Sequence, residues 1–267
     1  MSVRTRAVSF AAASAVVLGG ASAAHAVAVP GTSDPWLAGM PGGSTASSGD
    51  TAPAEAPVLV PGVPLSAGEV LTFSATGGVY NAPVSASSLS TLDPDGGRGT
   101  AGPIDGAVTH SAGAENGIAN LTAPINSLVG VFLSDAQPSL SRAPSGLSFP
   151  SAGSGPASLS PALQQPFFIG DGLTGTGSGS VQDFVIPAGA TRLYLGTMDE
   201  YSWYNNVGAF DVTVSAVGAA STPTPTSTPT PPPTSPGPTS VPEPATAPLL
   251  AGVLAGAFLL RPRSFAA

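Results

Sequence analysis

The chain of 267 residues contains seven arginines, no lysine, 15 acidic residues and no cysteine, and its formal net charge is −8. This balance argues against nucleic acid as a partner, because phosphates are bound by Lys and Arg, and it makes divalent cations natural ligands. The absence of cysteine excludes disulfides, thiolate chemistry and sulfur-based zinc sites.

The first 26 residues are predicted to be a secretory signal peptide. Arg4 and Arg6 precede an apolar stretch over residues 7–24, and Ala24-His25-Ala26 has the small-x-small pattern of a leader peptidase site. We therefore expect cleavage after Ala26. The exported part is strongly acidic, since residues 27–240 hold three arginines against 14 acidic residues.

Residues 27–216 are predicted to form one all-β domain, because short apolar runs alternate with Gly, Pro, Ser and Asn clusters and no helical period is sustained. In the last run, Phe210, Val212 and Val214 alternate with polar residues, as in a strand with one buried face. The expected strands are 58–60, 70–75, 128–133, 167–169, 181–186, 192–196 and 209–216. Short strands separated by turns favour an antiparallel β-sandwich.

The segment between the last two expected strands carries the most distinctive chemistry. It combines oxygen-bearing side chains with aromatic ones: Asp199, Glu200, Ser202, Asn205 and Asn206 beside Tyr201, Trp203 and Tyr204. Calcium binds hard oxygen ligands from carboxylates, amides and backbone carbonyls, so this loop is a candidate calcium site. The neighbouring aromatic rings offer flat apolar faces for a sugar.

Residues 217–240 are predicted to be a disordered Pro/Thr-rich linker, which extends in a polyproline-like conformation and packs no core. Residues 241–267 then contain Val241, Pro242, Glu243 and Pro244, an apolar run over 245–260, and Arg261 and Arg263. A run of this length spans roughly 24 Å as a helix, short of a hydrocarbon core of about 30 Å. We expect a short transmembrane helix, with an ordinary single-span anchor as the alternative reading.

This order of parts resembles the PEP-CTERM sorting signal of bacterial envelope proteins. The resemblance implies an exosortase-type sorting enzyme as a partner, attachment to the inner membrane until the tail is processed, and delivery to the outer surface or the exopolysaccharide matrix. Arg261 and Arg263 agree with a cytoplasmic C-terminus before processing.

The domain itself resembles the calcium-dependent galactose-binding lectin of pseudomonads and the related domains of many PEP-CTERM proteins. The shared residues are Gly68 with 70–75 and 77–80, 165–172, 187–193, and Asp199 followed by Asn205, Asn206, Gly208 and Phe210. The resemblance implies a galactose-binding-like or jelly-roll type sandwich. It also implies calcium ligands at Tyr80, Asp199, Ser202, Asn205 and Asn206, and a ligand-binding site that includes Trp203.

Two departures from the lectin pattern favour calcium over galactose as the expected ligand. The spacing from Asp199 to Asn205 is one residue shorter than in the lectin, and Met198 occupies the strictly aligned position. Between Tyr80 and Leu128 no counterpart of the lectin's sugar-contacting His and Gln is found. A purely structural hairpin loop remains the alternative.

Three other motifs are predicted to have structural roles and not to bind ligands or catalyse reactions. Gly170-x-Gly172-x-x-Gly175 matches a dinucleotide fingerprint, but the Gly/Ser-rich residues after it cannot open a helix, so a turn is expected. Asp93-Pro94-Asp95-Gly96-Gly97 lacks the spaced ligands of an EF-hand and is expected to be a tight turn. His110, the single histidine after residue 26, is expected to have no catalytic role.

The sequence thus predicts an exported, non-catalytic protein of the cell surface or exopolysaccharide matrix, with a calcium-assisted carbohydrate-binding module. A structural matrix protein without a specific ligand is the main alternative, and a secreted hydrolase is the third reading.

Overall fold

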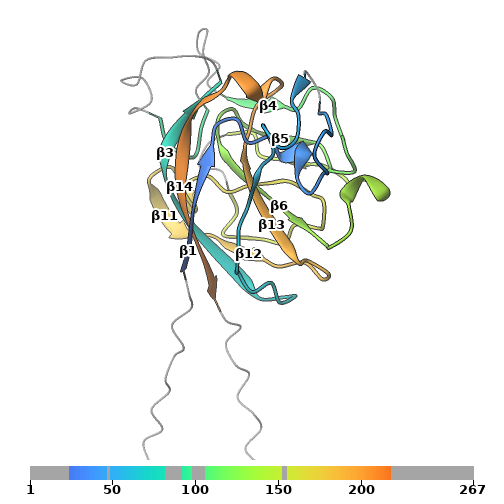
Figure 1. Cartoon of the computed structure of the whole chain (residues 1–267). Coiled ribbons are helices and arrows are strands. Elements are labelled where there is room, and N and C mark those ends of the chain that lie inside the picture. The colour runs from blue at the N-terminus through green and yellow to red at the C-terminus, as the bar shows by residue number, and fades with distance from the viewer. Residues whose placement is uncertain (1–23, 47–48, 82–91, 98–105, 152–154, 218–267) are drawn as a thin grey trace, which may run out of the picture. The chain divides into compact units, whose positions relative to one another are not determined.

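The computed structural model describes residues 24–46, 49–81, 92–97, 106–151 and 155–217 (Figure 1). Strands dominate these ranges, and their helical elements include three 3-10 turns, η1 (Pro35–Leu37), η3 (Pro138–Leu140) and η4 (Trp203–Asn205). Within the described ranges no helix has the length and apolar character needed to cross a membrane. The predicted tail 241–267 and residues 218–240 of the linker lie outside the described residues.

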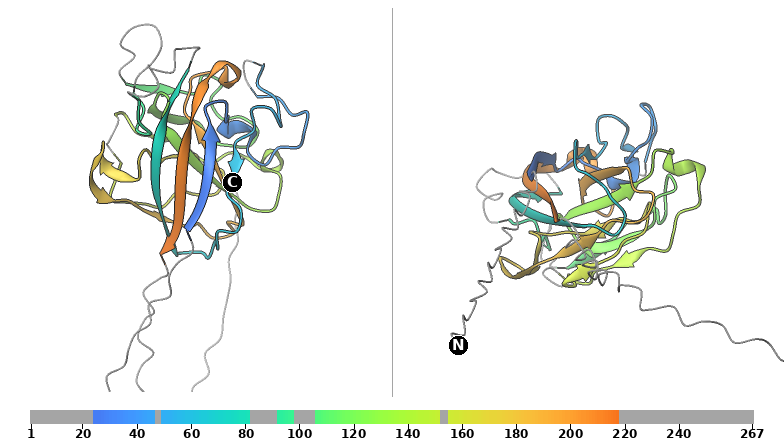
Figure 2. Two further views of the ribbon diagram at one scale, coloured as in Figure 1. Left: turned by 60° about the vertical axis from the view of Figure 1, so that its left-hand side comes forward. Right: turned by 90° about the horizontal axis from the view of Figure 1, so that it is seen from below.

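The first large sheet contains five strands in the order β1-β14-β3-β12-β8. Their bounds are β1 (Ala24–Pro30), β14 (Val207–Val217), β3 (Val70–Tyr80), β12 (Asp183–Val185) and β8 (Ser158–Leu159). The three longest strands lie side by side (Figure 2). β14 is the central one of the three, because it pairs with β3 along its whole length and with β1 along seven residues.

The second sheet has the order β2-β13-β6-β9. It consists of β2 (Val58–Leu59), β13 (Arg192–Thr197), β6 (Leu128–Leu133) and β9 (Phe167–Phe168). A smaller sheet combines β4 (Ala107–Thr109), β5 (Leu121–Pro124) and β7 (Leu147–Ser148), and β10 (Leu173–Gly175) pairs with β11 (Ser178–Val181).

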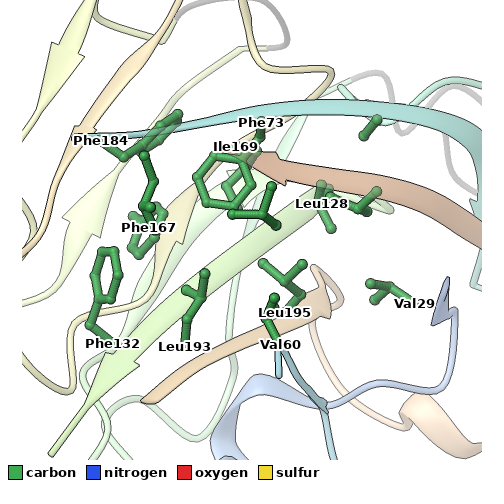
Figure 3. Close-up of a cluster of buried hydrophobic side chains, with 14 of the residues drawn as sticks. Val29, Val60, Phe73, Leu128, Phe132, Phe167, Ile169, Phe184, Leu193 and Leu195 are labelled. Carbon is green, nitrogen blue, oxygen red and sulfur yellow. The ribbon is translucent and has the colours of Figure 1, made fainter. Parts of the chain in front are cut away.

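The main hydrophobic core lies between the two large sheets (Figure 3). Val29, Phe73 and Phe184 come from the first sheet, and they meet side chains of β6, β9 and β13. The rings of Phe167 and Phe184 lie 5.4 Å apart and join the two sheets directly. Burying apolar side chains from both sheets in this way is what holds a β-sandwich together.

β6 is buried along its entire length, which explains its uninterrupted apolar sequence. Leu128 and Phe132 face the main core, whereas Val129, Val131 and Leu133 face a second cluster that includes Trp36, Met198 and Trp203. A strand covered on both faces needs apolar residues at every position. The second cluster extends from β6 to the loop that follows β13, because Met198 and Trp203 of that loop are buried in it.

The all-β sandwich agrees with the prediction from the sequence. Strand 128–133 has the expected bounds, and the alternation in β14 buries Phe210, Val212 and Val214 as expected. The main pairings are antiparallel, as the predicted antiparallel β-sandwich requires, whereas two short pairs, β12 with β8 and β5 with β7, are parallel. β1 includes Ala24, His25 and Ala26, which the sequence reading assigned to the signal peptide.

Candidate functional site

The β13–β14 loop, residues 198–206, is held at its start by hydrogen bonds of Met198 and of the preceding residue, Thr197. Met198 donates its N–H to the carbonyl of Ser127 at 2.9 Å, and its own carbonyl accepts from the N–H of Asn126 at 2.7 Å. Just before the loop, the N–H of Thr197 donates to the carbonyl of Ser33 at 2.9 Å. The hydroxyl of Thr197 donates to the carbonyl of Gly31 at 2.7 Å. The start of the loop is therefore rigidly positioned.

The middle of the loop is held by a carboxylate from far away in the sequence. Asp50 is fully buried, and it accepts the N–H of Trp203 at 3.1 Å and the N–H of Tyr204 at 2.8 Å. These are the otherwise unpaired donors at the start of η4, and Ser202 before them adopts a left-handed conformation with φ 66°. Asp50 lies 153 residues from Trp203, so no local pattern in the sequence indicates this contact.

Asp199 is 4% exposed, and its carboxylate accepts the N–H of Glu200 at 2.6 Å. Burial raises the pKa of Asp199 to about 6, while hydrogen bonds from Glu200, Asn206 and Tyr201 oppose the shift. The neighbouring Met198 is fully buried in the second cluster. Of these two adjacent residues, Asp199 is therefore the one whose side chain lies beside Asn206, as the site prediction requires.

Asn205 and Asn206 each hold a buried side-chain oxygen that has no hydrogen-bond partner. The amide group of Asn206 donates to the carbonyl of Gly31 at 3.2 Å, which fixes the side chain and leaves Oδ1 unsatisfied. Buried amide oxygens are normally paired, because an unpaired one loses its bond to water without replacement. Asp95 Oδ2 and Gln182 Oε1 are buried without a partner as well, so what sets this position apart is that two such amide oxygens lie in the same loop as the buried Asp199.

Tyr80 and Ser202 complete the predicted ligand set. Tyr80 ends β3 and pairs with Val207, so its backbone lies next to the end of the β13–β14 loop. The carbonyl of Ser202 accepts the N–H of Asn205 at 3.3 Å, and a carbonyl oxygen has a second lone pair. The backbone of Tyr80 thus pairs with the residue that follows Asn206, and the side chain of Asn206 is hydrogen-bonded to Asp199.

Trp203 does not fit its predicted role as a sugar contact. Its side chain is fully buried, donates from Nε1 to the carbonyl of Thr197 at 2.9 Å, and lies 5.5 Å from the ring of Trp36. Burying this large apolar ring in the second cluster stabilises the fold more than exposing it to water would. The aromatic side chains that the loop exposes are Tyr201 and Tyr204, at 52% and 56%.

His110 is buried and packs against two tryptophans of the second cluster. Its ring stacks on Trp36 at 3.7 Å and approaches the carboxylate of Glu115 at 3.2 Å. The ring of Trp203 lies 5.6 Å away on another side. This packing gives His110 a structural role beneath the β13–β14 loop.

A second buried carboxylate lies in the turn 93–97. Asp95 is fully buried, packs against the backbone of Gly170 and accepts the N–H of Asp171 at 3.3 Å. Burial, followed by the nearby charge of Asp171, raises the pKa of Asp95 to about 6. The tight turn predicted here is confirmed by the bond from the N–H of Gly96 to the carbonyl of Asp93 at 3.1 Å. The turn predicted at Gly170–Gly172 is confirmed too, by the bond from Gly172 to Ile169 at 3.2 Å.

Among the residues that the structure describes, neither Asp199 nor Asp50 forms a salt bridge with an arginine. Arg192 instead donates to the carbonyls of Ser134 and Ala136, and the salt bridge found in the described part of the chain joins His110 and Glu115. Within the described ranges, no three residues among His, Cys, Asp and Glu form a metal-binding group. Any cation at this loop would therefore depend on amide and backbone oxygens in addition to Asp199.

No protein-family model matches the chain, and no curated protein matches it either. Among solved structures, one similar chain is described as the EclA N-terminal domain, a PllA-like lectin. The similarity has a TM-score of 0.30 and 13% sequence identity, and it covers 72% of this chain and 96% of that chain. A likeness at this level assigns neither a family nor a ligand.

Proposed function

We propose that the protein is an exported, non-catalytic surface or matrix module that binds carbohydrate through a calcium ion held by the β13–β14 loop. The observation that carries the proposal is the pair of buried, unpartnered oxygens on Asn205 and Asn206, in the same loop as the buried carboxylate of Asp199. Leaving a buried acceptor unpaired costs about 1–3 kcal/mol. A cation that binds both oxygens removes this cost.

The donor set fits calcium in kind. Asp199 supplies a carboxylate, Asn205 and Asn206 supply amide oxygens, and Ser202 and Tyr80 supply backbone carbonyls. Calcium takes about six to eight oxygen ligands of these types, whereas zinc prefers nitrogen and sulfur. With one carboxylate among the ligands, the expected dissociation constant lies in the range of about 10⁻⁴–10⁻³ M that is typical of extracellular modules.

The electrostatics of the loop also favour a cation. Asp199 has a pKa of about 6, so its carboxylate is mostly ionised at neutral pH although it is buried. The charge of Asp50 raises this pKa further. A divalent cation would compensate the buried negative charge of Asp199, which forms no salt bridge with an arginine in the described ranges.

The proposed sugar contact uses the exposed face of the loop. Five protein oxygens leave coordination positions that two neighbouring hydroxyls of a sugar can fill. Tyr201 and Tyr204 stand at the same loop with half of their surface exposed, and a ring face there can pack on the C–H side of a sugar. In this proposal Tyr201 and Tyr204 make the sugar contact that was predicted from the sequence for Trp203.

The position of the loop suits display at a surface. The loop precedes Val207, the first residue of β14, whereas Val217 ends β14 at the other end of the sheet, where β1 begins (Figure 1). Eleven extended residues separate these ends by roughly 35 Å. The loop therefore lies at the end of the sheet opposite Val217, the last described residue of the domain. The proposed ligand of the loop is exopolysaccharide.

Calcium titration of the purified protein by calorimetry tests the metal site. We expect binding by the wild type, loss of binding in Asp199→Asn, and unchanged binding in Asp95→Asn. Asn has nearly the shape of Asp, and both variants replace a buried carboxylate whose pKa is about 6. Equal losses in the two variants would contradict the assignment, because they would indicate a general effect on folding.

A glycan array read with calcium and again with chelator tests the carbohydrate ligand. Binding that requires calcium and that Tyr204→Ala weakens supports the proposal. Binding that persists in chelator would place the sugar elsewhere on the protein.

A structural matrix protein without a specific ligand is the second candidate. It is favoured by the bonds from Trp203 and Tyr204 to Asp50, which hold the loop without any metal. On this alternative, calcium changes neither the stability of the protein nor its binding to polysaccharide.

A further inference from the structure

A hollow of about 660 Å³ opens on the surface between the turn 114–117 and the segment 141–145. Ala114 and Gly117 line one side of it, and residues 141–145, with Arg142 among them, line the other. Its volume lies within the range of about 300–1,000 Å³ that is usual for ligand pockets. The hollow is therefore large enough for a small ligand or for one unit of a longer chain.

The two sides of the hollow are joined by a glutamine side chain. Gln164 donates from Nε2 to the carbonyl of Gly117 at 2.7 Å, and its Oε1 accepts the hydroxyl of Ser141 at 2.7 Å. At the far end of the segment, Gln165 donates from Nε2 to the carbonyl of Ser145 at 2.8 Å. The backbone around the hollow is thus fixed before any ligand binds, which lowers the entropic cost of binding.

Arg142 gives the hollow a positive charge on an otherwise acidic domain. The other arginine of the described ranges, Arg192, is used within the fold, where it donates to the carbonyls of Ser134 and Ala136. Arg142 is exposed, and among the described residues it forms no salt bridge. A guanidinium group binds a carboxylate through two parallel hydrogen bonds in a fixed geometry. The hollow is therefore suited to a ligand that carries a carboxylate.

A short segment connects the hollow to the β13–β14 loop. The N–H of Ser111 donates to the carbonyl of Glu200 in that loop at 3.0 Å. Ala114, at the edge of the hollow, follows Ser111 by a span that extended backbone limits to about 11 Å. The carboxylate of the adjacent Glu115 contacts His110 at 3.2 Å. A sugar chain bound at the β13–β14 loop can therefore extend along this segment into the hollow.

We propose that the hollow binds a uronate unit of an acidic polysaccharide, with its carboxylate held by Arg142, while another unit of the same chain binds at the β13–β14 loop. The inference rests on the proposed function, because it takes the ligand of that loop to be a polysaccharide. It narrows the substrate class to polysaccharides that carry carboxylates. Because the domain is acidic, such a polymer is repelled at long range, and the contact with Arg142 offsets part of that repulsion.

The test compares two matched probes, an oligomer of galacturonic acid and the same oligomer with its carboxyl groups reduced to alcohols. Calorimetry with the purified protein in calcium should show that the acidic oligomer binds about twofold to fivefold more tightly, as expected for an exposed ion pair. Arg142→Gln should remove this preference, and Arg142→Lys, which keeps the charge but not the planar fork, should keep part of it. Equal affinity of the wild type for both probes would overturn the inference.

Ser74→Asp is the matched control for overall charge. Ser74 is exposed on β3, and the change makes the protein more negative by the same amount as Arg142→Gln. A loss of preference in Ser74→Asp as large as that in Arg142→Gln would overturn the inference, because it would reflect net charge alone.

The same titrations in chelator separate the hollow from the calcium site. A preference for the acidic oligomer that persists in chelator and still depends on Arg142 supports the hollow even if the β13–β14 loop binds no calcium. Calcium-dependent binding of both oligomers that Arg142→Gln leaves unchanged would overturn the inference and leave the proposed function standing.

Discussion

Two buried aspartates, Asp199 in the β13–β14 loop and Asp95 in the turn 93–97, share their burial and their raised pKa but differ in their neighbours. Both are at most 4% exposed, and both have a pKa of about 6. Asp95 lies beside Asp171, whose two carboxylate oxygens already accept the N–H groups of Leu173 and Gly177 at 2.8 Å.

Asp199, in contrast, shares its loop with two amide oxygens that have no partner. Burial and a shifted pKa therefore do not distinguish a binding site from a structural turn in this protein. Asp95 Oδ2 is itself buried without a hydrogen-bond partner, so a single unsatisfied oxygen does not distinguish the two sites either. The difference is that the loop of Asp199 adds two unpartnered amide oxygens, which are groups that a cation can bind.

The largest expected effect that tests this comparison is the pH dependence of stability in chelator. A carboxyl whose folded pKa is about 6 and whose ordinary value is 3.8 binds its proton more tightly in the folded state. The stabilisation that each such carboxyl gives the folded state is fully present below pH 3.8. It is lost as the pH rises through 6, which lowers the free energy of unfolding by about 3 kcal/mol for each group. Denaturant unfolding between pH 4 and 7 measures it.

Calcium should separate the two carboxyls in the same experiment. At pH 7 we expect saturating calcium to recover the free energy of unfolding that is lost when Asp199 ionises. Calcium should not recover the part that is lost when Asp95 ionises. Asp95→Asn should therefore reduce the pH dependence in calcium, whereas Asp199→Asn should remove the effect of calcium. A pH profile that calcium does not change would contradict this separation.

Gly170→Ala tests the structural character of the Asp95 turn. Gly170 has φ 63°, and a Cβ atom there would collide with the carboxylate of Asp95. We expect a loss of about 2–4 kcal/mol of stability, from the left-handed backbone and the overpacking together. Calcium affinity, measured by calorimetry, should stay at the wild-type value.

Gly177→Ala is the matched control for the backbone contribution. Gly177 also has a positive φ, of 62°, but a Cβ atom there meets nothing within 4 Å. A loss in Gly170→Ala no larger than the loss in Gly177→Ala would show that contact with Asp95 is unimportant.

Asp50→Ala tests how far the loop depends on its distant cap. Removing the acceptor of two backbone N–H groups should cost about 0.5–2 kcal/mol of stability. Because η4 directly precedes Asn206, calcium affinity should fall as well. Thermal melts and calcium titration of one preparation measure both effects, and a stability loss with unchanged affinity would show that the loop keeps its shape without Asp50.

Tyr204→Ala is expected to have the smallest effect. Loss of an exposed stacking face should weaken sugar binding by about 0.5–1.5 kcal/mol, roughly twofold to twelvefold, with calcium affinity unchanged. Tyr204→Phe keeps the ring and should bind sugar nearly as well as the wild type. Equal binding by all three proteins on a calcium-loaded glycan surface would remove Tyr204 from the site.

The sequence predicted the parts of the fold that follow from local pattern. The alternation of Phe210, Val212 and Val214 identified β14, and the apolar run 128–133 identified the strand β6, whose burial on both faces only the structure shows. β1 was missed because Ala24, His25 and Ala26 also satisfy a leader peptidase pattern. A strand at the edge of a sheet shows its role only through its partner, and here the partner lies at the other end of the domain.

The candidate site was predictable in its residues but not in its geometry. The order of Asp199, Asn205 and Asn206 along the chain pointed to the loop. Asp50 could not be found, since its contact with Trp203 spans 153 residues. The burial of Trp203 was equally hidden, because the second cluster that accepts its ring is assembled from segments far apart in the sequence.

Thermal melting of the wild type and Asp199→Asn, across calcium concentrations and in chelator, tests the proposed calcium site most directly. A ligand that binds only the folded state raises the melting temperature as its concentration increases. We predict such a rise in the wild type and none in Asp199→Asn. Coincident melts of the wild type with and without calcium, or an equal rise in the variant, would contradict the calcium site at the β13–β14 loop.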